Sequence, residues 1–213
     1  MGVMKEKQKI GPRTQVQRKE ESELRLVVAA REVLARKGWV GMTLADVGQL
    51  AGVSRGLASH HFGNKAGLLR ALTLHINLSF EKEMKAAPPA KGGLEAILGY
   101  VSVYLGRADK KWTNTRTLLL LMAEALIENS ENSEVLAVYM QRMFGYLAEN
   151  IRIGIVQGEI NADISPEVGA EMIIGALRGM MLQRLIKGGD INVTEMGCHV
   201  LQMIKRAFST ARL

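Results

Sequence analysis

Apolar side chains recur every three or four residues along most of the chain, and this spacing is typical of amphipathic helices. The pattern predicts helices over residues 21–37, 65–85, 93–107, 113–128, 133–157, 166–187 and 193–211, with two shorter helices between residues 43 and 65. We find no segment with the two-residue alternation of a half-buried strand. The sequence therefore predicts an all-α fold.

The stretch from Thr43 to Lys65 predicts two short helices that meet at a sharp turn. Thr43 can cap the first helix, and Gly52, just past its end, can adopt the left-handed conformation that turns the chain. Ser54 can then cap the second helix. This is the helix-turn-helix arrangement, in which the second helix is presented to the major groove of DNA.

Composition divides the chain into three parts. Residues 1–20 are polar and interrupted by Gly11 and Pro12, which predicts a flexible basic arm that can lie in a DNA minor groove. We expect a three-helix DNA-binding domain over residues 21–68, and a six-helix domain for effector binding and dimerisation over residues 69–213. A proline pair, Pro88 and Pro89, follows the fourth helix and marks a boundary.

The excess of positive charge lies around the helix-turn-helix. Residues 1–70 contain 13 Lys and Arg against 6 Asp and Glu, a difference that equals the net charge of +7, and the 15 basic and 15 acidic residues that follow cancel. Neutralisation of phosphates supplies most of the non-specific affinity of a protein for DNA. A basic face alone is more often a solvated surface, but beside this motif it favours double-stranded DNA as the partner.

The composition also excludes several classes of protein. The longest apolar run, residues 118–127, is broken by Glu124 and is too short to cross a bilayer, and the first basic residues lack the apolar segment of a signal peptide. We therefore expect a soluble cytoplasmic protein with no membrane partner. The single cysteine, Cys198, excludes a disulfide framework within the chain.

We find no group of residues that would carry catalysis. The sequence lacks a glycine-rich phosphate loop, a nucleophile with a partnered base and a metal-ligand spacing. His60 and His61 are adjacent, but successive side chains of a helix point about 100° apart, so the two cannot chelate one ion together. We expect no enzyme activity, no cofactor and no metal site.

The last two predicted helices carry more apolar surface than a single buried face needs. Gly175 and Gly179, four residues apart, would allow another helix to approach closely, which predicts a homodimer. The alternative is that the chain's own bundle covers both helices. The residues expected at the dimer interface are Ile174, Gly175, Leu177, Gly179, Met181, Val200, Ile204 and Phe208.

The run RLVVAAREVLARKGWVGMTLADVGQLAGVSRGLASHHFGNKAGLLRAL, residues 25–72, resembles the DNA-binding domain of the tetracycline-repressor (TetR) family of transcriptional regulators. The resemblance lies in the paired alanines, the aromatic residue after Gly38, AGVS, the HF pair and the lysine followed by paired leucines. The segment ASHHF is similar to the choline-responsive repressors of glycine-betaine synthesis. Two positions depart from the family, because Ser59 replaces a usual tyrosine and Gly48 a usual alanine. A glycine inside a helix costs about 1 kcal/mol relative to alanine unless close packing requires it.

The resemblance implies which residues contact DNA. The start of the second short helix would face the bases, its middle would contact the backbone or the groove wall, and the helix starts on either side should bind phosphates. Arg55 can donate two hydrogen bonds to one guanine. The expected contact residues are Thr43, Ser54, Arg55, Gly56, Leu57, Ser59, His60, His61 and Lys65.

The resemblance also implies a small-molecule effector inside the six-helix domain. Glu124 lies within an apolar run, and with nearby aromatic rings it would suit a cationic, choline-like effector through charge and cation-π attraction. The alternative is that Glu124 faces solvent and that the aromatic and methionine side chains form the core. The candidate lining residues are Tyr100, Tyr104, Trp112, Met122, Glu124, Tyr139, Met143 and Phe144.

Together these features predict a ligand-responsive transcriptional repressor that binds a palindromic DNA operator as a homodimer and is released by a small-molecule effector. An activator or a less specific architectural DNA-binding protein is the first alternative. An enzyme or carrier whose basic domain is incidental is the second.

Overall fold

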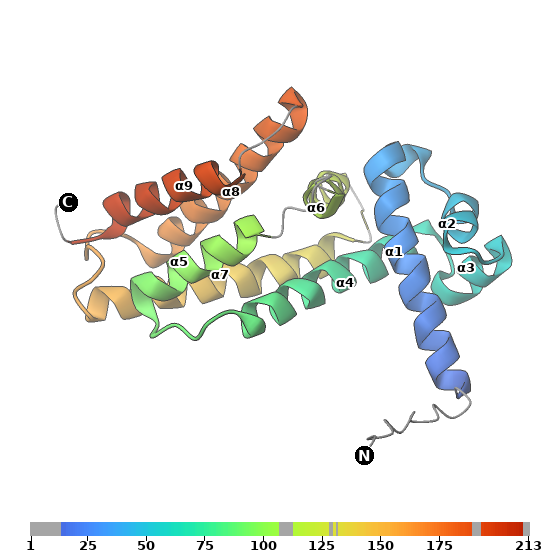
Figure 1. Ribbon diagram of the computed structural model, residues 1–213, viewed down its shortest axis with the longest axis horizontal. Helices are drawn as coiled ribbons and strands as arrows, with labels where there is room; N and C mark the ends of the chain where they lie inside the picture. Colours follow the sequence, from blue (N-terminus) through green and yellow to red (C-terminus); the bar gives the residue numbers. More distant parts are fainter. Residues whose placement is uncertain (1–13, 107–112, 128–129, 131, 189–192, 211–213) are drawn as a thin grey trace, which may run out of the picture.

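The described part of the chain, residues 14–106, 113–127, 130, 132–188 and 193–210 of a computed structural model, folds into nine helices (Figure 1). An isolated bridge between Ile160 and Ser209 is the one β-type pairing among these residues. The all-α prediction is confirmed. The helices are α1 Gln15–Gly41, α2 Leu44–Ala51, α3 Arg55–Phe62, α4 Lys65–Ala86, α5 Gly93–Gly106, α6 Thr113–Ala125, α7 Ser133–Val156, α8 Pro166–Lys187 and α9 Val193–Phe208.

The first helix begins earlier than the sequence pattern predicted. Thr14 accepts a hydrogen bond from the Gln17 amide at 3.2 Å, and the Gln17 side chain accepts one from the Thr14 amide at 3.0 Å. These two bonds form a capping box, which satisfies the free amides at a helix start. Residues 15–20, which we assigned to a flexible arm, therefore belong to α1, and residues 1–13 of the predicted arm lie outside the described part of the chain.

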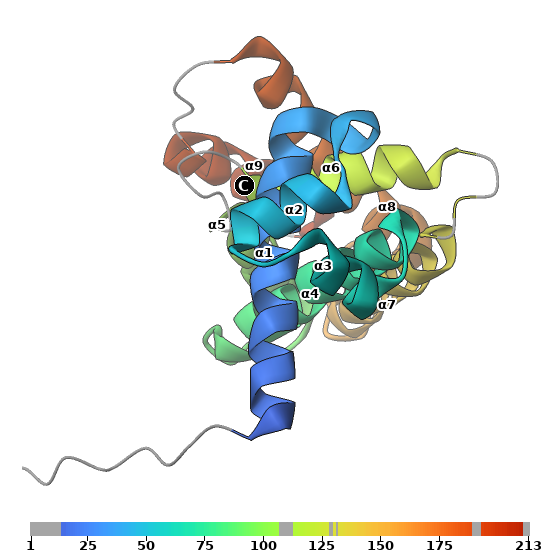
Figure 2. The same cartoon turned by 90° about the vertical axis from the view of Figure 1, so that its right-hand side faces the viewer.

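The helices of the predicted DNA-binding domain lie at one end of the molecule (Figures 1 and 2), where their buried side chains form one hydrophobic core. Helices α1 to α3 and the first half of α4 supply buried side chains such as Leu26, Val47 and Leu72. Helix α6 contributes as well, because Leu118 and Leu121 are buried in the same core. The core of the predicted DNA-binding domain thus contains a helix from the predicted effector domain.

Polar contacts reinforce the packing of α6 on α1. Arg31 Nη1 donates to Asn114 Oδ1 at 2.9 Å, and Thr117 Oγ1 donates to the Arg31 carbonyl at 3.2 Å. Thr117 is fully buried, so its hydroxyl needs this partner. Packing and hydrogen bonds thus connect α6 to α1, the helix against which α2 packs.

A second core fills the other end of the molecule. It begins at Phe80 in the second half of α4 and includes Tyr100 of α5, Ile151 of α7 and Leu177 of α8. Helix α7 packs along α5 and α8, and α9 packs on α5. Helix α4 therefore runs from one core into the other, as Figure 1 shows.

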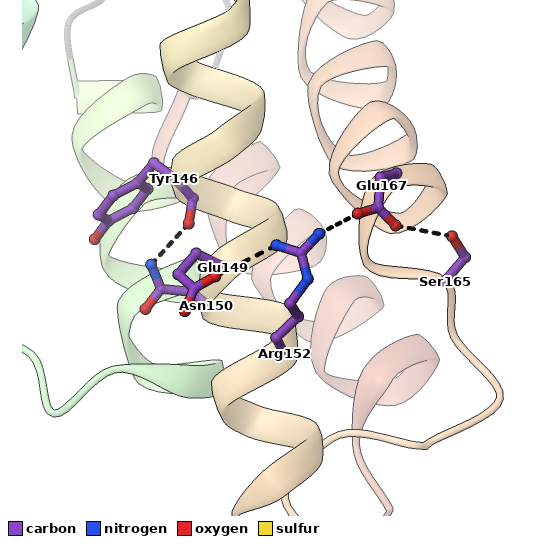
Figure 3. Close-up of polar contacts among 6 residues, drawn as sticks. All are labelled: Tyr146, Glu149, Asn150, Arg152, Ser165 and Glu167. Carbon is purple, nitrogen blue, oxygen red and sulfur yellow. Dashed lines mark hydrogen bonds and ion pairs between the residues drawn. The ribbon is translucent and has the colours of Figure 1, made fainter.

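Charged side chains join α7 to the start of α8 (Figure 3). Arg152 pairs with Glu149 of its own helix at 3.3 Å and with Glu167 of α8, and the Ser165 hydroxyl donates to Glu167 at 3.4 Å. Because these side chains are largely exposed, each pair contributes at most about 1 kcal/mol.

None of the helices in the described residues combines the length and apolar character needed to cross a membrane.

Gly67 allows α4 to begin directly after α3. A Cβ atom at position 67 would collide with the carbonyl oxygen of Phe62, so the helix start would have to shift. We expect Gly67→Ala to lower the free energy of unfolding by about 1 to 3 kcal/mol, the range typical of overpacking. Urea denaturation of the full chain measures it.

Gly145→Ala is the matched control, because it lies on an exposed face of α7 with no atom within 4 Å of an added Cβ. We expect this change to raise the free energy of unfolding by up to about 1 kcal/mol. Equal effects of the two substitutions would contradict the close approach at residue 67.

Candidate DNA-binding interface

Helix α2 is fixed at its start by a network around Asp46. The Asp46 carboxylate accepts hydrogen bonds from Lys37 Nζ at 2.7 Å and from Thr43 Oγ1 at 2.8 Å, and Thr43 Oγ1 accepts one from the Asp46 amide at 3.1 Å. The bonds from Lys37 and Thr43 hold the pKa of the Asp46 carboxyl below its usual value. The predicted cap at Thr43 is confirmed, with Asp46 as its partner in a capping box.

The turn between α2 and α3 depends on two glycines. Gly52 adopts the left-handed conformation with φ of 69°, as the sequence predicted. A Cβ atom on Gly48 would lie 3.1 Å from the Val53 carbonyl oxygen and 3.2 Å from that of Ser54. The departure from alanine at position 48 is therefore accompanied by close packing of the turn against α2.

Helix α3 has one exposed face that carries the residues expected to contact DNA. Ser54 caps the helix by accepting a hydrogen bond from the Leu57 amide at 3.2 Å, and Arg55, Gly56 and His60 are exposed. Ala58 is buried on the opposite face. The start of α3 thus presents free amides and a guanidinium together, an arrangement that suits phosphates and guanine edges.

The remaining α3 residues are less accessible. Leu57, Ser59 and His61 are half-buried, and the ring of His61 lies 5.9 Å from that of Phe62. The rings of His60 and His61 meet edge to face, with centroids 6.0 Å apart, rather than converging on one point. Within the residues described, no three His, Cys, Asp or Glu side chains gather as metal ligands.

Lys65 is held beside the end of α1 rather than projecting freely. Its Nζ lies 3.9 Å from the centroid of the Trp39 ring and donates to the Val40 carbonyl at 3.4 Å. Burial lowers the pKa of the Lys65 ammonium. Because Val40 is three residues from Thr43, the two predicted phosphate contacts lie at neighbouring helix ends. Sequence reasoning missed Trp39 as the residue that orients Lys65.

The largest group of predicted effector residues meets at a pocket between α4, α5 and α7. Its volume is about 210 Å³, and three predicted residues line it: Tyr100, Tyr139 and Met143. The remaining lining residues were not predicted, and most come from the second half of α4. The sequence of that segment contains no motif that indicates effector binding. They are Phe80, Glu81, Met84, Lys85, Arg142 and Tyr146.

The pocket is lined mainly by aromatic and methionine side chains, with three charged residues among them. The Phe80 and Tyr100 rings meet edge to face, with centroids 5.3 Å apart, and the Tyr146 ring lies 5.8 Å from that of Tyr100. Burial raises the pKa of the Tyr146 hydroxyl. Arg142 of α7 pairs with Glu81 of α4 at 3.3 Å, so an ion pair joins two of the helices that line the pocket.

The predicted cage around Glu124 does not form. Glu124 is buried at the end of α6, where Oε1 accepts a hydrogen bond from Ser130 Oγ at 2.9 Å, and it does not line this pocket. Tyr104 lies beside a separate small cavity, while Met122 and Phe144 pack against the core. Trp112 lies outside the described residues. The alternative prediction, that the aromatic residues belong to the core and Glu124 faces solvent, is thus correct for Tyr104 and wrong for Glu124, which is buried.

Most residues expected at the dimer interface are buried within the single chain. They belong to the second core, where α8 packs on α7 and α9 packs on α5, so within the single chain these side chains are not exposed to a partner. These residues are Ile174, Leu177, Met181, Val200, Ile204 and Phe208. The two others, Gly175 and Gly179, are exposed, and an added Cβ at either would meet no atom within 4 Å.

The glycines lie in an exposed apolar stripe on α8 that we did not predict. Its positions are spaced alternately four and three residues apart, the period of helices that pack side by side. The sequence contained this signal, but the more strongly apolar opposite face obscured it. The α8 stripe consists of Val168, Met172, Gly175, Gly179, Leu182 and Ile186.

Comparison with known proteins places this architecture among transcriptional regulators. Residues 26–72 match the profile described as "Bacterial regulatory proteins, tetR family". The regulator CymR of Pseudomonas putida is 51% identical over 59 residues, which cover 28% of this chain and 29% of CymR. The regulator BetI of Rhizobium meliloti (strain 1021) is 27% identical over 172 residues, 79% of this chain and 80% of BetI.

A solved structure shares the fold over nearly the whole chain. It is a putative transcriptional regulator from Saccharomonospora viridis in complex with choline, with a TM-score of 0.79 and 20% identity, covering 90% of this chain and all of that one. Residues 26–72 thus carry a DNA-binding domain of the TetR family, and the chain resembles the BetI regulators over most of its length. Because these relatives are transcriptional regulators, the prediction that the chain is not an enzyme is confirmed.

Proposed function

We propose that this chain is a cytoplasmic repressor that binds an inverted-repeat DNA operator as a homodimer and leaves it when a small molecule occupies the α4–α5–α7 pocket. The observation that carries the proposal is the exposed face of α3, where Arg55 follows the capping residue Ser54. Lys65, at the start of α4, lies beside the end of α1. The whole net positive charge of the chain lies in the same part of the sequence.

The DNA contacts divide into two kinds. Arg55 is exposed at the first turn of α3 and reads a base, because its planar guanidinium can donate to both acceptors of guanine. Thr43 and Lys65 hold phosphates on either side and fix the position of α3. Ser54, Gly56, Leu57, Ser59, His60 and His61 complete the proposed contact surface, with Ser59 and the histidines against the backbone or the groove wall.

The homodimer forms through the α8 stripe. Four exposed apolar side chains flank two glycines that leave room for the backbone of a second helix. The spacing of the α8 stripe suits two copies of α8 that pack at a shallow angle. A two-fold dimer presents two copies of α3 to half-sites about one DNA turn apart.

The effector acts through α4. A molecule between Phe80 and Met84 on α4 and Tyr139 on α7 would push the two helices apart. The first half of α4 lies in the core of the DNA-binding domain, so this displacement changes the position of α3. The pocket volume of about 210 Å³ is below that of drug-sized sites, which favours a small, largely apolar ligand with aromatic contacts.

Selection of binding sites from random DNA by the full chain tests the proposal. We expect an inverted repeat whose half-sites lie about one helical turn apart. A promoter fused to that sequence should be repressed by the chain in cells. Activation instead of repression, or enrichment without a repeat, would favour the activator or the architectural protein.

Arg55→Ala separates base reading from phosphate binding in the same selection. We expect the variant to lose preference at one base pair in each half-site, a discrimination of roughly 1 to 3 kcal/mol. Lys65→Ala should instead weaken binding to all sequences and reduce the slope of log affinity against log salt by about one per subunit. A uniform loss with Arg55→Ala would show that Arg55 holds only phosphate.

Leu182→Glu places a carboxylate within the α8 stripe. We expect it to convert the dimer to a monomer in analytical ultracentrifugation and to lower operator affinity by roughly 100-fold, because the two half-sites no longer bind together. Val138→Glu, on an exposed position of α7, is the control and should remain dimeric. A dimeric Leu182→Glu variant with unchanged operator affinity would exclude this interface.

A further inference from the structure

A chain of hydrogen bonds joins α4 to the turn between α6 and α7. Thr73 Oγ1 of α4 donates to Asn132 Oδ1 at 2.7 Å, and the Asn132 amide donates to Ser130 Oγ at 3.2 Å. Ser130 Oγ then donates to Glu124 Oε1, at the end of α6. Thr73 and Asn132 are each 1% exposed, so water does not replace these partners. Three helices thus meet through one buried polar network.

Asn132 occupies the N-cap position of α7 but does not cap it. Asparagine is among the best capping residues, because its side-chain oxygen accepts a hydrogen bond from an amide in the first turn. Here the side chain makes no cap bond, and the backbone at Asn132 has helical angles of −87° and −15° instead of the extended conformation that capping requires. The side-chain oxygen binds Thr73 instead.

Buried polar atoms in and beside the network have no hydrogen bonds. Asn132 Nδ2, Glu124 Oε2 and Asn77 Oδ1 have none, and Asn77 lies one turn beyond Thr73 on α4. Buried polar atoms without partners are rare in native proteins and accompany strain or a change of state. Each of these residues is more than nine-tenths buried. The hydrogen bonding seen here is therefore not optimal for any of the three residues.

We propose that Asn132 is a two-position switch that binds either Thr73 of α4 or the first turn of α7. In the first position, which the structure contains, Asn132 ties α4 to the start of α7. In the second, the backbone of Asn132 becomes extended and its side chain accepts a hydrogen bond from the backbone amide of Glu134 or Val135. The bond to Thr73 is then broken, and α4 is no longer tied to α7. The proposal rests on the proposed function, because it describes how the effector pocket controls the DNA-binding domain.

The place of Asn132 relative to the pocket indicates which of its two positions belongs to the DNA-binding state. Thr73 and Asn132 lie seven residues, about 10 Å along a helix, before Phe80 and Tyr139, which both line the proposed effector pocket. A ligand that separates α4 from α7 at the pocket strains the bond between Thr73 and Asn132. The bond therefore favours the DNA-binding state, and capping of α7 favours the released state.

The two positions are close in free energy. A buried hydrogen bond between side chains and a helix cap each change an equilibrium by roughly 2- to 30-fold. Exchange of one for the other therefore leaves neither state strongly favoured, so that a weakly bound small molecule can shift their populations.

Thr73→Val tests the switch, since it removes the hydroxyl with little change of shape. Amide hydrogen exchange of the full chain without DNA should show slower exchange at Glu134 and Val135, by roughly 2- to 10-fold, and faster exchange around residue 77 of α4. Affinity for the selected operator should fall by roughly 2- to 10-fold. Thr73→Ser keeps the hydroxyl and should match the unmodified chain in both measurements.

Asn132→Ala can make neither bond and should exchange rapidly at both the start of α7 and the middle of α4. If Thr73→Val left exchange at Glu134 and Val135 unchanged or faster, Asn132 would not switch and the proposal would be overturned. Slower exchange there with unchanged operator affinity would also overturn it, because the switch would then not control DNA binding. Failure of the unmodified chain to select any operator would instead reject the proposed function, which the exchange measurement does not require.

Discussion

The structure depends on one helix that belongs to two hydrophobic cores. The first half of α4 buries Leu68, Leu69 and Leu72 among the helices of the DNA-binding domain, and the second half buries Phe80 in the helical body. Close-packed cores do not deform continuously, so a displacement at one end of α4 must be accommodated at the other. Helix α6 adds a second connection, since Leu118 and Leu121 lie in the core of the DNA-binding domain.

Local sequence signals predicted the helices and the turn of the helix-turn-helix well, because caps and glycines act over a few residues. Thr43, Gly52 and Ser54 perform the roles that their positions indicated. The predicted start of α1 was wrong, because the polar composition of residues 15–20 favoured a flexible arm. The residues of the capping box, Thr14 and Gln17, were nevertheless present in the sequence. Composition was thus a weaker guide there than the capping pattern.

Contacts between distant segments could not be predicted in the same way. Periodicity identified the strongly apolar face of α8, but it could not tell whether that face meets the chain's own helices or a second copy, and Leu177 lies in the chain's own core. Glu124 was assigned to an effector cage from its apolar neighbours in sequence, yet it binds Ser130 at the end of α6. The pocket residues of α4, such as Met84, became evident only once α4 was placed beside α7.

The central claim is that a group inserted between α4 and α7 lowers affinity for DNA. Met84→Trp tests it without knowledge of the effector, because the indole would occupy the pocket that Met84 lines. The decisive measurement is the affinity of this variant for the selected operator at fixed salt. We expect it to fall on the order of tenfold, while the variant stays folded and dimeric. Unchanged operator affinity, with the indole shown by its fluorescence to be buried, would contradict the account.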